Sequence, residues 1–191
     1  MPYSKKHKEE TRQSILKSAN ELFSSKGFSA VTVNEVMQNC SLTRGAFYAH
    51  FNSKSNLYSE ALKFSATNSE LAKLKPKEIS SKDWLGQLLN AYLSTEHVDG
   101  ERPCPLAFLA IDIVSQDKTA KKAYAHTFKN MNKIILDYAG DNAPCNKEDI
   151  LSLTSMIIGA VAVSRTIEDK DLVKNILASC RQQARLILGG I

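Results

Sequence analysis

A run of cationic, phenolic and imidazole side chains at helical spacing is the part of the sequence best suited to binding chemistry. Arg44, Tyr48 and His50 follow Thr43, and no Asp or Glu stands between Thr43 and Tyr58. Arg, Tyr and His side chains donate hydrogen bonds to phosphate oxygens, and Arg also pairs with the edge of a guanine through two parallel bonds. This acid-free surface is what a helix needs in order to approach a nucleic-acid backbone.

Two short helices must position these side chains. Thr32 and Glu35 have the spacing of a capping box, so a helix is predicted to begin after Thr32. A second helix is predicted to begin at an N-cap Thr43 and to continue to Phe51, with Phe47 and Phe51 pointing inward. Two short helices joined by a tight turn are typical of a helix-turn-helix, although the spacing alone also fits a helical hairpin with a solvated polar face.

The remainder of the chain also has helical periodicity. The 191 residues include only 8 Gly and 5 Pro, so few turns separate long elements, and no strand pattern is found. The first helix is predicted to end at Lys26-Gly27, with Gly at the left-handed cap position. A buried helix is predicted from Cys104 to Val114, because this stretch is apolar on nearly every side. We therefore predict an all-α protein.

Composition excludes several classes of protein. No apolar run approaches the roughly 20 residues of a membrane span, and the first ten residues contain no apolar segment of a signal peptide. Cys40, Cys104, Cys145 and Cys180 form no CxxC pair, so neither a zinc site nor a disulfide framework is expected, and a reducing cytoplasm is the simplest compartment. No nucleophile pattern or Gly-rich phosphate loop is found, so we expect no enzymatic activity, no cofactor and no metal.

The positive charge of the chain is concentrated near its beginning. The formal net charge is +5, and residues 1–64 hold nine Lys and Arg against five Asp and Glu. The remaining residues hold 16 basic and 15 acidic side chains and are nearly neutral. The excess therefore lies on the third of the chain that carries the predicted helix-turn-helix, which favours nucleic acid as a partner.

The stretch from Thr11 to Leu57 resembles the TetR family of bacterial transcriptional regulators. The matching pattern is an ordered series of short motifs over about a quarter of the chain. It consists of Ile15, Ala19 and Leu22-Phe23, then Lys26-Gly27-Phe28, Thr32-Val33, Leu42 to Phe51, and Ser53-Lys54 with Leu57. The resemblance implies an N-terminal three-helix DNA-binding domain with a helix-turn-helix in residues 1–53. It implies a larger helical ligand-binding and dimerisation domain in residues 54–191.

The resemblance also implies which residues meet operator DNA. Phe47 and Phe51 match core positions, whereas the positions around them match contacts to phosphate or bases. The DNA-binding residues implied in this way are Thr32, Asn34, Thr43, Arg44, Gly45, Ala46, Tyr48, His50 and Lys54. Two departures from the family pattern stand out: Cys40-Ser41 replaces a usual Gly in the turn, and Asn34 stands where Arg is frequent. We expect local backbone strain at the turn and the loss of one cationic contact.

A homodimer on a palindromic operator follows from the resemblance, with recognition helices about 34–36 Å apart. The helix through Met156 mixes small and large side chains, which allows a partner helix to approach closely. An internal core helix fits the same pattern equally well, and the resemblance favours the dimer. The predicted interface residues are Met156, Ile157, Gly159, Ala160, Ile176, Ala184 and Ile187.

A small hydrophobic effector is expected to bind among the middle helices, although a stripe of large apolar side chains also fits an ordinary core. The predicted wall residues are Trp84, Leu88, Tyr92, Phe108, Ile111, Asp112, Tyr124 and Phe128. Asp112 is the polar exception. It either binds an amine or hydroxyl of the effector or pairs with a buried Arg or backbone donor, and the second interpretation is preferred.

Cys104 suggests an alternative mode of regulation. It follows Arg102-Pro103 at a predicted helix N-terminus, where backbone dipoles lower a thiol pKa, so the protein is alternatively a sensor of electrophiles or oxidants. An inert, small apolar residue is the preferred interpretation of Cys104. A further alternative is a helical small-molecule carrier with a vestigial DNA-binding domain, for which the missing turn Gly and Asn34 argue.

Overall fold

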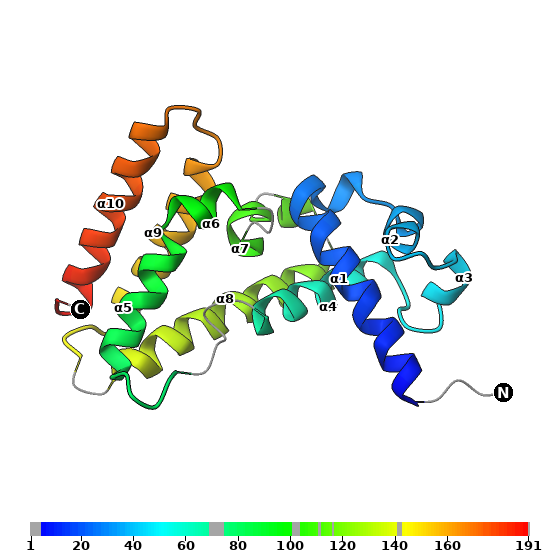
Figure 1. Cartoon of the computed structure of the whole chain (residues 1–191), viewed down its shortest axis with the longest axis horizontal. Helices are drawn as coiled ribbons and strands as arrows, with labels where there is room; N and C mark the ends of the chain where they lie inside the picture. Colours follow the sequence, from blue (N-terminus) through cyan, green and yellow to red (C-terminus); the bar gives the residue numbers. More distant parts are fainter. Residues whose placement is uncertain are drawn as a thin grey trace. The chain divides into compact units, whose positions relative to one another are not determined.

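The computed structural model describes residues 5–68, 75–100, 104–110, 112–115, 117–140 and 143–190, and every regular element in them is helical (Figure 1). The predicted all-α class is confirmed. The helices of the first part are α1 (Lys5–Ala30), α2 (Val33–Asn39), α3 (Arg44–Phe47) and α4 (Lys54–Thr67). They are followed by α5 (Ser81–Tyr92), α6 (Thr95–Asp99), α7 (Pro105–Phe108), the short 3₁₀ helix η2 (Asp112–Ser115), α8 (Lys118–Ala139), α9 (Lys147–Ser164) and α10 (Lys170–Ile187).

The chain forms two compact units. Unit 1 comprises Met1–Thr67 and Phe108–Thr127, and unit 2 comprises Asn68–Ala107 and Phe128–Ile191. Contacts therefore place α4 with the helices before it, and η2 and the first part of α8 join them from later in the chain. This grouping by contact does not test the functional division into residues 1–53 and 54–191, which stays a prediction.

The helix α1 is kinked at Gly27, shortly before its end at Ala30. The backbone of Gly27 lies at φ 81° and ψ 168°, in the positive-φ region that side chains disfavour, so the helix is interrupted at the predicted residue. Val31 is fully buried immediately beyond this kink, and the chain then enters the N-cap of α2. The kink therefore allows the path from α1 to α2 to turn back over the core.

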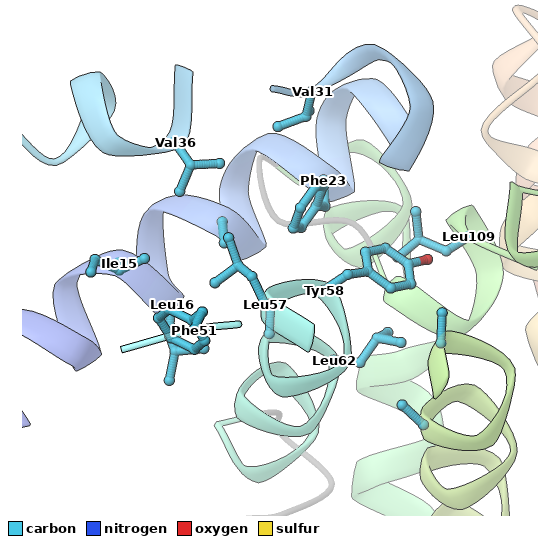
Figure 2. Close-up of a cluster of buried hydrophobic side chains, with 14 of the residues drawn as sticks. Ile15, Leu16, Phe23, Val31, Val36, Phe51, Leu57, Tyr58, Leu62 and Leu109 are labelled. Atoms are coloured by element: carbon cyan, nitrogen blue, oxygen red, sulfur yellow. The ribbon is translucent and has the colours of Figure 1, made fainter. Parts of the chain in front are cut away.

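The core of unit 1 is built from one face of each of its helices (Figure 2). Phe47 and Phe51 are each 1% exposed, so their predicted inward orientation is confirmed, and their rings stack with centroids 5.8 Å apart. Tyr58 of α4 meets the ring of Phe23 edge-on at 5.1 Å and is fully buried. Its hydroxyl has no hydrogen-bond partner among the described atoms, and burial raises the pKa of this phenol well above its usual value.

In unit 2, α9 and α10 pack against each other, and α10 also packs against α5 and α6. Asn146 caps α9 in a full capping box with Asp149, and Asp169 caps α10. The inner sides of these helices hold Ile150, Leu153 and Ile157, with Thr154 as a buried polar member. The Thr154 hydroxyl donates to Asn132 Oδ1 of α8 at 3.1 Å, which satisfies it inside the apolar core.

The predicted continuous helix from Cys104 to Val114 is wrong. Only Pro105–Phe108 and Asp112–Ser115 are helical, as α7 and η2, and Val114 is 68% exposed rather than buried. The Asp112 carboxylate accepts a hydrogen bond from the backbone N–H of Phe28. A tertiary contact of this kind is not encoded in local hydrophobic periodicity, which is why the pattern alone failed here.

Candidate nucleic-acid interface

The start of α2 is locked by the capping box that its sequence predicts. Glu35 N–H donates to Thr32 Oγ1 at 3.1 Å, and Thr32 N–H donates to Glu35 Oε2 at 2.7 Å. The backbone hydrogen bond from Thr32, its hydroxyl and the nearby Lys26 ammonium lower the pKa of Glu35. The Thr32 hydroxyl also donates to Glu35 Oε2 at 2.9 Å, so a DNA phosphate at Thr32 would compete with this carboxylate.

The turn between α2 and α3 is held in a conformation that usually requires glycine. Ser41 has φ 57°, which lies in the left-handed region, so the strain predicted at this turn is confirmed. Ser41 N–H donates to the Gln38 carbonyl and Leu42 N–H to the Met37 carbonyl, and these bonds hold the turn closed. The turn of a helix-turn-helix therefore forms without its usual glycine.

Replacement of Ser41 by Gly is expected to stabilise the protein. Left-handed backbone costs a non-glycine residue about 1–2 kcal/mol, and the added freedom of the unfolded chain returns about half of that, so we expect a gain of about 0.5–1 kcal/mol. Ser14→Gly, at an exposed position inside α1, is the control and is expected to destabilise by a similar amount. Chemical denaturation measures both, and a less stable Ser41→Gly variant would show that the turn is unstrained.

The second helix of the motif is shorter than predicted. Regular helix covers only Arg44–Phe47, and Tyr48 to His50 continue it as turns. Thr43 has the extended backbone of an N-cap, but its side chain makes no capping hydrogen bond, which corrects the prediction of a side-chain cap. The Thr43 hydroxyl is therefore not occupied by the helix that follows it.

The predicted DNA-binding residues are accessible on the surface of unit 1. Tyr48 is 61% exposed, Arg44 is exposed, and a Cβ at Gly45 would have only the Thr43 hydroxyl within 4 Å, at 3.9 Å. The remaining positions divide by accessibility: Thr32, Asn34 and Thr43 are exposed, whereas Ala46, His50 and Lys54 are half-buried. The helix-turn-helix thus brings cationic and hydroxyl side chains to the surface above the buried Phe47 and Phe51.

His50 is half-buried beside the first turns of α1. Burial, together with the nearby charges of Lys8 and Arg12, lowers its pKa, and Glu9 opposes the shift. The Nδ1 atom of His50 is buried and has no hydrogen-bond partner among the described atoms. The imidazole is therefore neutral at neutral pH in the free chain.

Lowering the pH is expected to strengthen DNA binding through His50. A phosphate beside His50 would favour the imidazolium, so binding would take up a proton, and affinity would rise by up to about 10-fold per pH unit as pH falls from 8 toward 6. His50→Gln removes this dependence, whereas the exposed His126→Gln retains it. Fluorescence anisotropy with labelled DNA across this range measures both slopes, and equal slopes would place His50 away from the phosphates.

Arg12 and Lys8 are surface cations that the sequence pattern did not single out. The Arg12 guanidinium pairs with Glu60 of α4 at 3.0 Å and lies 5.3 Å from the centroid of the Phe51 ring. Arg12 therefore joins α1 to α4 and to the end of the helix-turn-helix. The four-residue spacing of Lys8 and Arg12 on one face of α1 is the signal that identifies them as neighbours.

The predicted effector-wall residues divide between the two units. Trp84, Leu88, Tyr92 and Phe128 belong to unit 2. Phe108, Asp112 and Tyr124 belong to unit 1, and Ile111 lies outside the described residues. Within unit 2, Leu88 and Tyr92 are buried on α5, and Trp84 is half-buried.

A groove of about 470 Å³ between the start of α5 and the end of α10 has none of the predicted wall residues. Its lining is largely charged and polar, and includes Lys82, Asp83 and Arg185. It is open to solvent, unlike the enclosed pockets that usually hold small hydrophobic ligands.

Cys104 does not have the environment of a reactive thiol. It is buried in unit 2, and burial raises its pKa, although a hydrogen bond with the Tyr92 hydroxyl at 3.0 Å opposes the shift. The expectation that a helix N-terminus lowers this pKa is therefore wrong, because desolvation outweighs the backbone N–H groups of a four-residue α7. This environment favours the inert interpretation of Cys104.

The predicted dimer residues fall into two groups. Ile157, Ala160 and Ala184 are 0%, 6% and 0% exposed and pack inside the chain, so their side chains are not accessible to a partner. The other predicted members are half-buried: Met156, Gly159, Ile176 and Ile187.

Further apolar side chains on α9 and α10 are exposed, although they were not predicted as interface residues. Leu151 and Val163 stand at four-residue multiples from Gly159 on α9, which places them along one ridge of the helix. Leu172 and Leu186 are exposed on α10. The outward side of the α9 and α10 pair is therefore partly apolar.

The helix-turn-helix region matches a known family. The model of the family described as bacterial regulatory proteins, tetR family, matches residues 15–61. The chain is 43% identical over 65 residues to the HTH-type transcriptional regulator AcrR of Shigella flexneri, a match that covers 34% of this chain and 30% of AcrR. It is 41% identical over 64 residues to the transposon Tn10 TetC protein of Escherichia coli, covering 31% and 32%. These matches span about a third of each relative.

Solved structures resemble the whole chain. A transcriptional regulator of the TetR/AcrR family superposes with a TM-score of 0.71 at 21% identity, covering 94% of this chain and 99% of that one. The reduced form of E. coli NemR superposes with a TM-score of 0.76 at 15% identity, covering 91% and 96%. The shared fold therefore extends beyond the helix-turn-helix to more than nine-tenths of this chain.

Proposed function

Since the chain belongs to the TetR family of bacterial regulatory proteins, we propose that it is a ligand-responsive transcriptional repressor that binds a palindromic operator as a homodimer. The observation that carries the proposal is the helix-turn-helix of unit 1. Arg44 and Tyr48 are exposed there above a buried Phe47, and no carboxylate interrupts the surface from Thr43 to Asn56. In this proposal the protein acts in the bacterial cytoplasm and is on the nucleoid when DNA-bound.

Direct readout is assigned to the start of α3. The Arg44 guanidinium pairs with a guanine edge in the major groove, and Thr43 and Tyr48 fix the register through phosphates. Gly45 leaves room for close approach of the backbone. The closed turn at Ser41 supports this assignment, because loss of the usual glycine has not disrupted the motif.

The homodimer is assigned to the outward side of α9 and α10. Gly159 allows a partner helix to come close, and Leu151, Val163, Leu172 and Leu186 supply exposed apolar area around it. Two such helix pairs form a four-helix interface and bring two helix-turn-helix motifs to one operator.

A small hydrophobic effector is assigned to unit 2, and its binding releases the dimer from DNA. The described buried side chains there are apolar apart from a few hydroxyl groups and a thiol, among them Tyr92 and Thr154, so the matching effector is uncharged. Among the residues that the structure describes, no helix is long and apolar enough to cross a membrane.

Binding to the DNA that flanks the protein's own gene tests the proposal. We expect an electrophoretic shift with this fragment that resists an excess of unrelated DNA and weakens steeply as salt rises. A shift that unrelated DNA abolishes equally would contradict operator recognition. The absence of any shift would favour the small-molecule carrier.

A further inference from the structure

Asp112 makes a contact within unit 1 that neither DNA reading nor dimerisation uses. Its Oδ2 accepts a 2.6 Å hydrogen bond from the backbone N–H of Phe28, which lies 84 residues earlier in the chain. A bond between a carboxylate and an N–H group is charge-assisted and stronger than one between neutral groups. The contact fastens η2 to the end of α1.

Gly27 makes this contact sterically feasible. At φ 81° the helix is kinked, and the Phe28 N–H that follows donates to the Asp112 carboxylate. A Cβ at Gly27 would lie 3.7 Å from both Cγ and Oδ1 of Asp112 and would need a strained backbone. The Gly27-Phe28 corner, defined by these two residues, therefore has both the conformation and the space for Asp112.

The same corner supports Lys54, one of the predicted phosphate contacts. The Lys54 ammonium lies 4.2 Å from the centroid of the Phe28 ring, within the range of a cation–π interaction. Burial lowers the pKa of Lys54, and the charges of Asp112 and Glu35 oppose the shift. Asp112 therefore acts on Lys54 both through its own charge and through the residue whose ring lies under the ammonium.

We propose that Asp112 is a latch: closed on Phe28, it holds the Gly27-Phe28 corner and the Lys54 ammonium in place for DNA, and opening it weakens DNA binding. This inference rests on the proposed function. The segment Asn68–Ala107, which immediately precedes Phe108 in sequence, belongs to unit 2. Asp112 thus follows closely in sequence after the unit to which the effector is assigned.

Three variants distinguish the loss of the Asp112–Phe28 hydrogen bond from a change in net charge. Asp112→Ala removes the acceptor, and Asp112→Asn keeps an oxygen acceptor while removing the same charge. Asp169→Ala is the matched control, because Asp169 also accepts backbone N–H bonds, from Asp171 and Leu172, at the start of α10 in unit 2. All three variants gain one positive unit of net charge, so charge alone cannot separate them.

Amide hydrogen exchange of the full-length protein tests the contact without DNA. In Asp112→Ala we expect exchange at the Phe28 amide to accelerate by about 10-fold or more, since a protecting bond is lost. Asp169→Ala is expected to leave that amide within about threefold of the unmodified protein, and Asp112→Asn, whose acceptor is neutral, is expected to lie between the two. Equal protection of Phe28 in Asp112→Ala would overturn the latch.

Affinity for the fragment that flanks the gene tests the consequence. Asp112→Ala is expected to bind about 10-fold more weakly despite its added positive charge, whereas Asp112→Asn recovers most of the loss and Asp169→Ala binds normally. Unchanged or tighter binding by Asp112→Ala would overturn the latch as a control of DNA affinity. If the unmodified protein itself does not bind, the proposed function fails, and the exchange result alone decides whether Asp112 holds the corner.

Discussion

Gly159→Glu is expected to convert the proposed dimer to a monomer of 21.1 kDa. A Cβ at Gly159 would meet no atom within 4 Å, so the substitution has room in the single chain and even gains helix propensity. In the proposed dimer the same space belongs to the partner helix, where a carboxylate would be buried without a counter-charge. Light scattering after size exclusion measures the mass directly.

We expect the affinity of Gly159→Glu for DNA to fall, because this variant no longer forms the dimer. A monomer holds one half-site and loses the advantage of a linked second contact, which is worth about 100-fold to 10,000-fold. Gly86→Glu is the matched control, because Gly86 is also inside a helix, α5, and also has nothing within 4 Å of a Cβ. A Gly159→Glu variant that remains dimeric would move the interface away from this face of α9.

Arg44→Ala is expected to weaken specific DNA binding by about 10-fold to 100-fold, which corresponds to the loss of a bidentate contact to guanine. Arg44 is exposed at the start of α3, and no acid lies nearby in sequence to hold it. The loss should appear on the flanking fragment and be small on unrelated DNA, because phosphate contacts remain.

A surface lysine provides the comparison for Arg44. Lys129→Ala removes the same charge from an exposed position on α8 and should bind within about twofold of the unmodified protein, since it loses only long-range attraction. Equal losses for Arg44→Ala on both kinds of DNA would assign Arg44 to a phosphate instead of a base.

Local chemistry made much of unit 1 predictable. Thr32 with Glu35, and Gly27, each specify a helix end or kink through hydrogen bonds or backbone angles that depend on neighbours in sequence. The four-residue spacing of Phe47 and Phe51 likewise predicts that both rings share one buried face.

Features that depend on distant residues were not predictable from the pattern. Ile157 and Ala184 have the sizes expected at a dimer seam, but burial by the chain's own helices decides their role. Hydrophobicity around Cys104 predicted a long helix, whereas the structure divides the stretch and directs Asp112 to Phe28. The pKa of Cys104 depends on desolvation, which a sequence motif for a helix start does not contain.

The described buried side chains of unit 1, Tyr58 included, do not change protonation state near neutral pH. The other buried polar side chains described in this unit are Ser and Thr hydroxyls, and the raised pKa keeps the Tyr58 proton in place throughout the physiological range. Protons exchanged near neutral pH therefore come from groups that are not fully buried. His50, which is half-buried beside α1, is one of them. A change in cellular pH would thus alter the proposed affinity for DNA, whereas the buried core of unit 1 would keep the same charge.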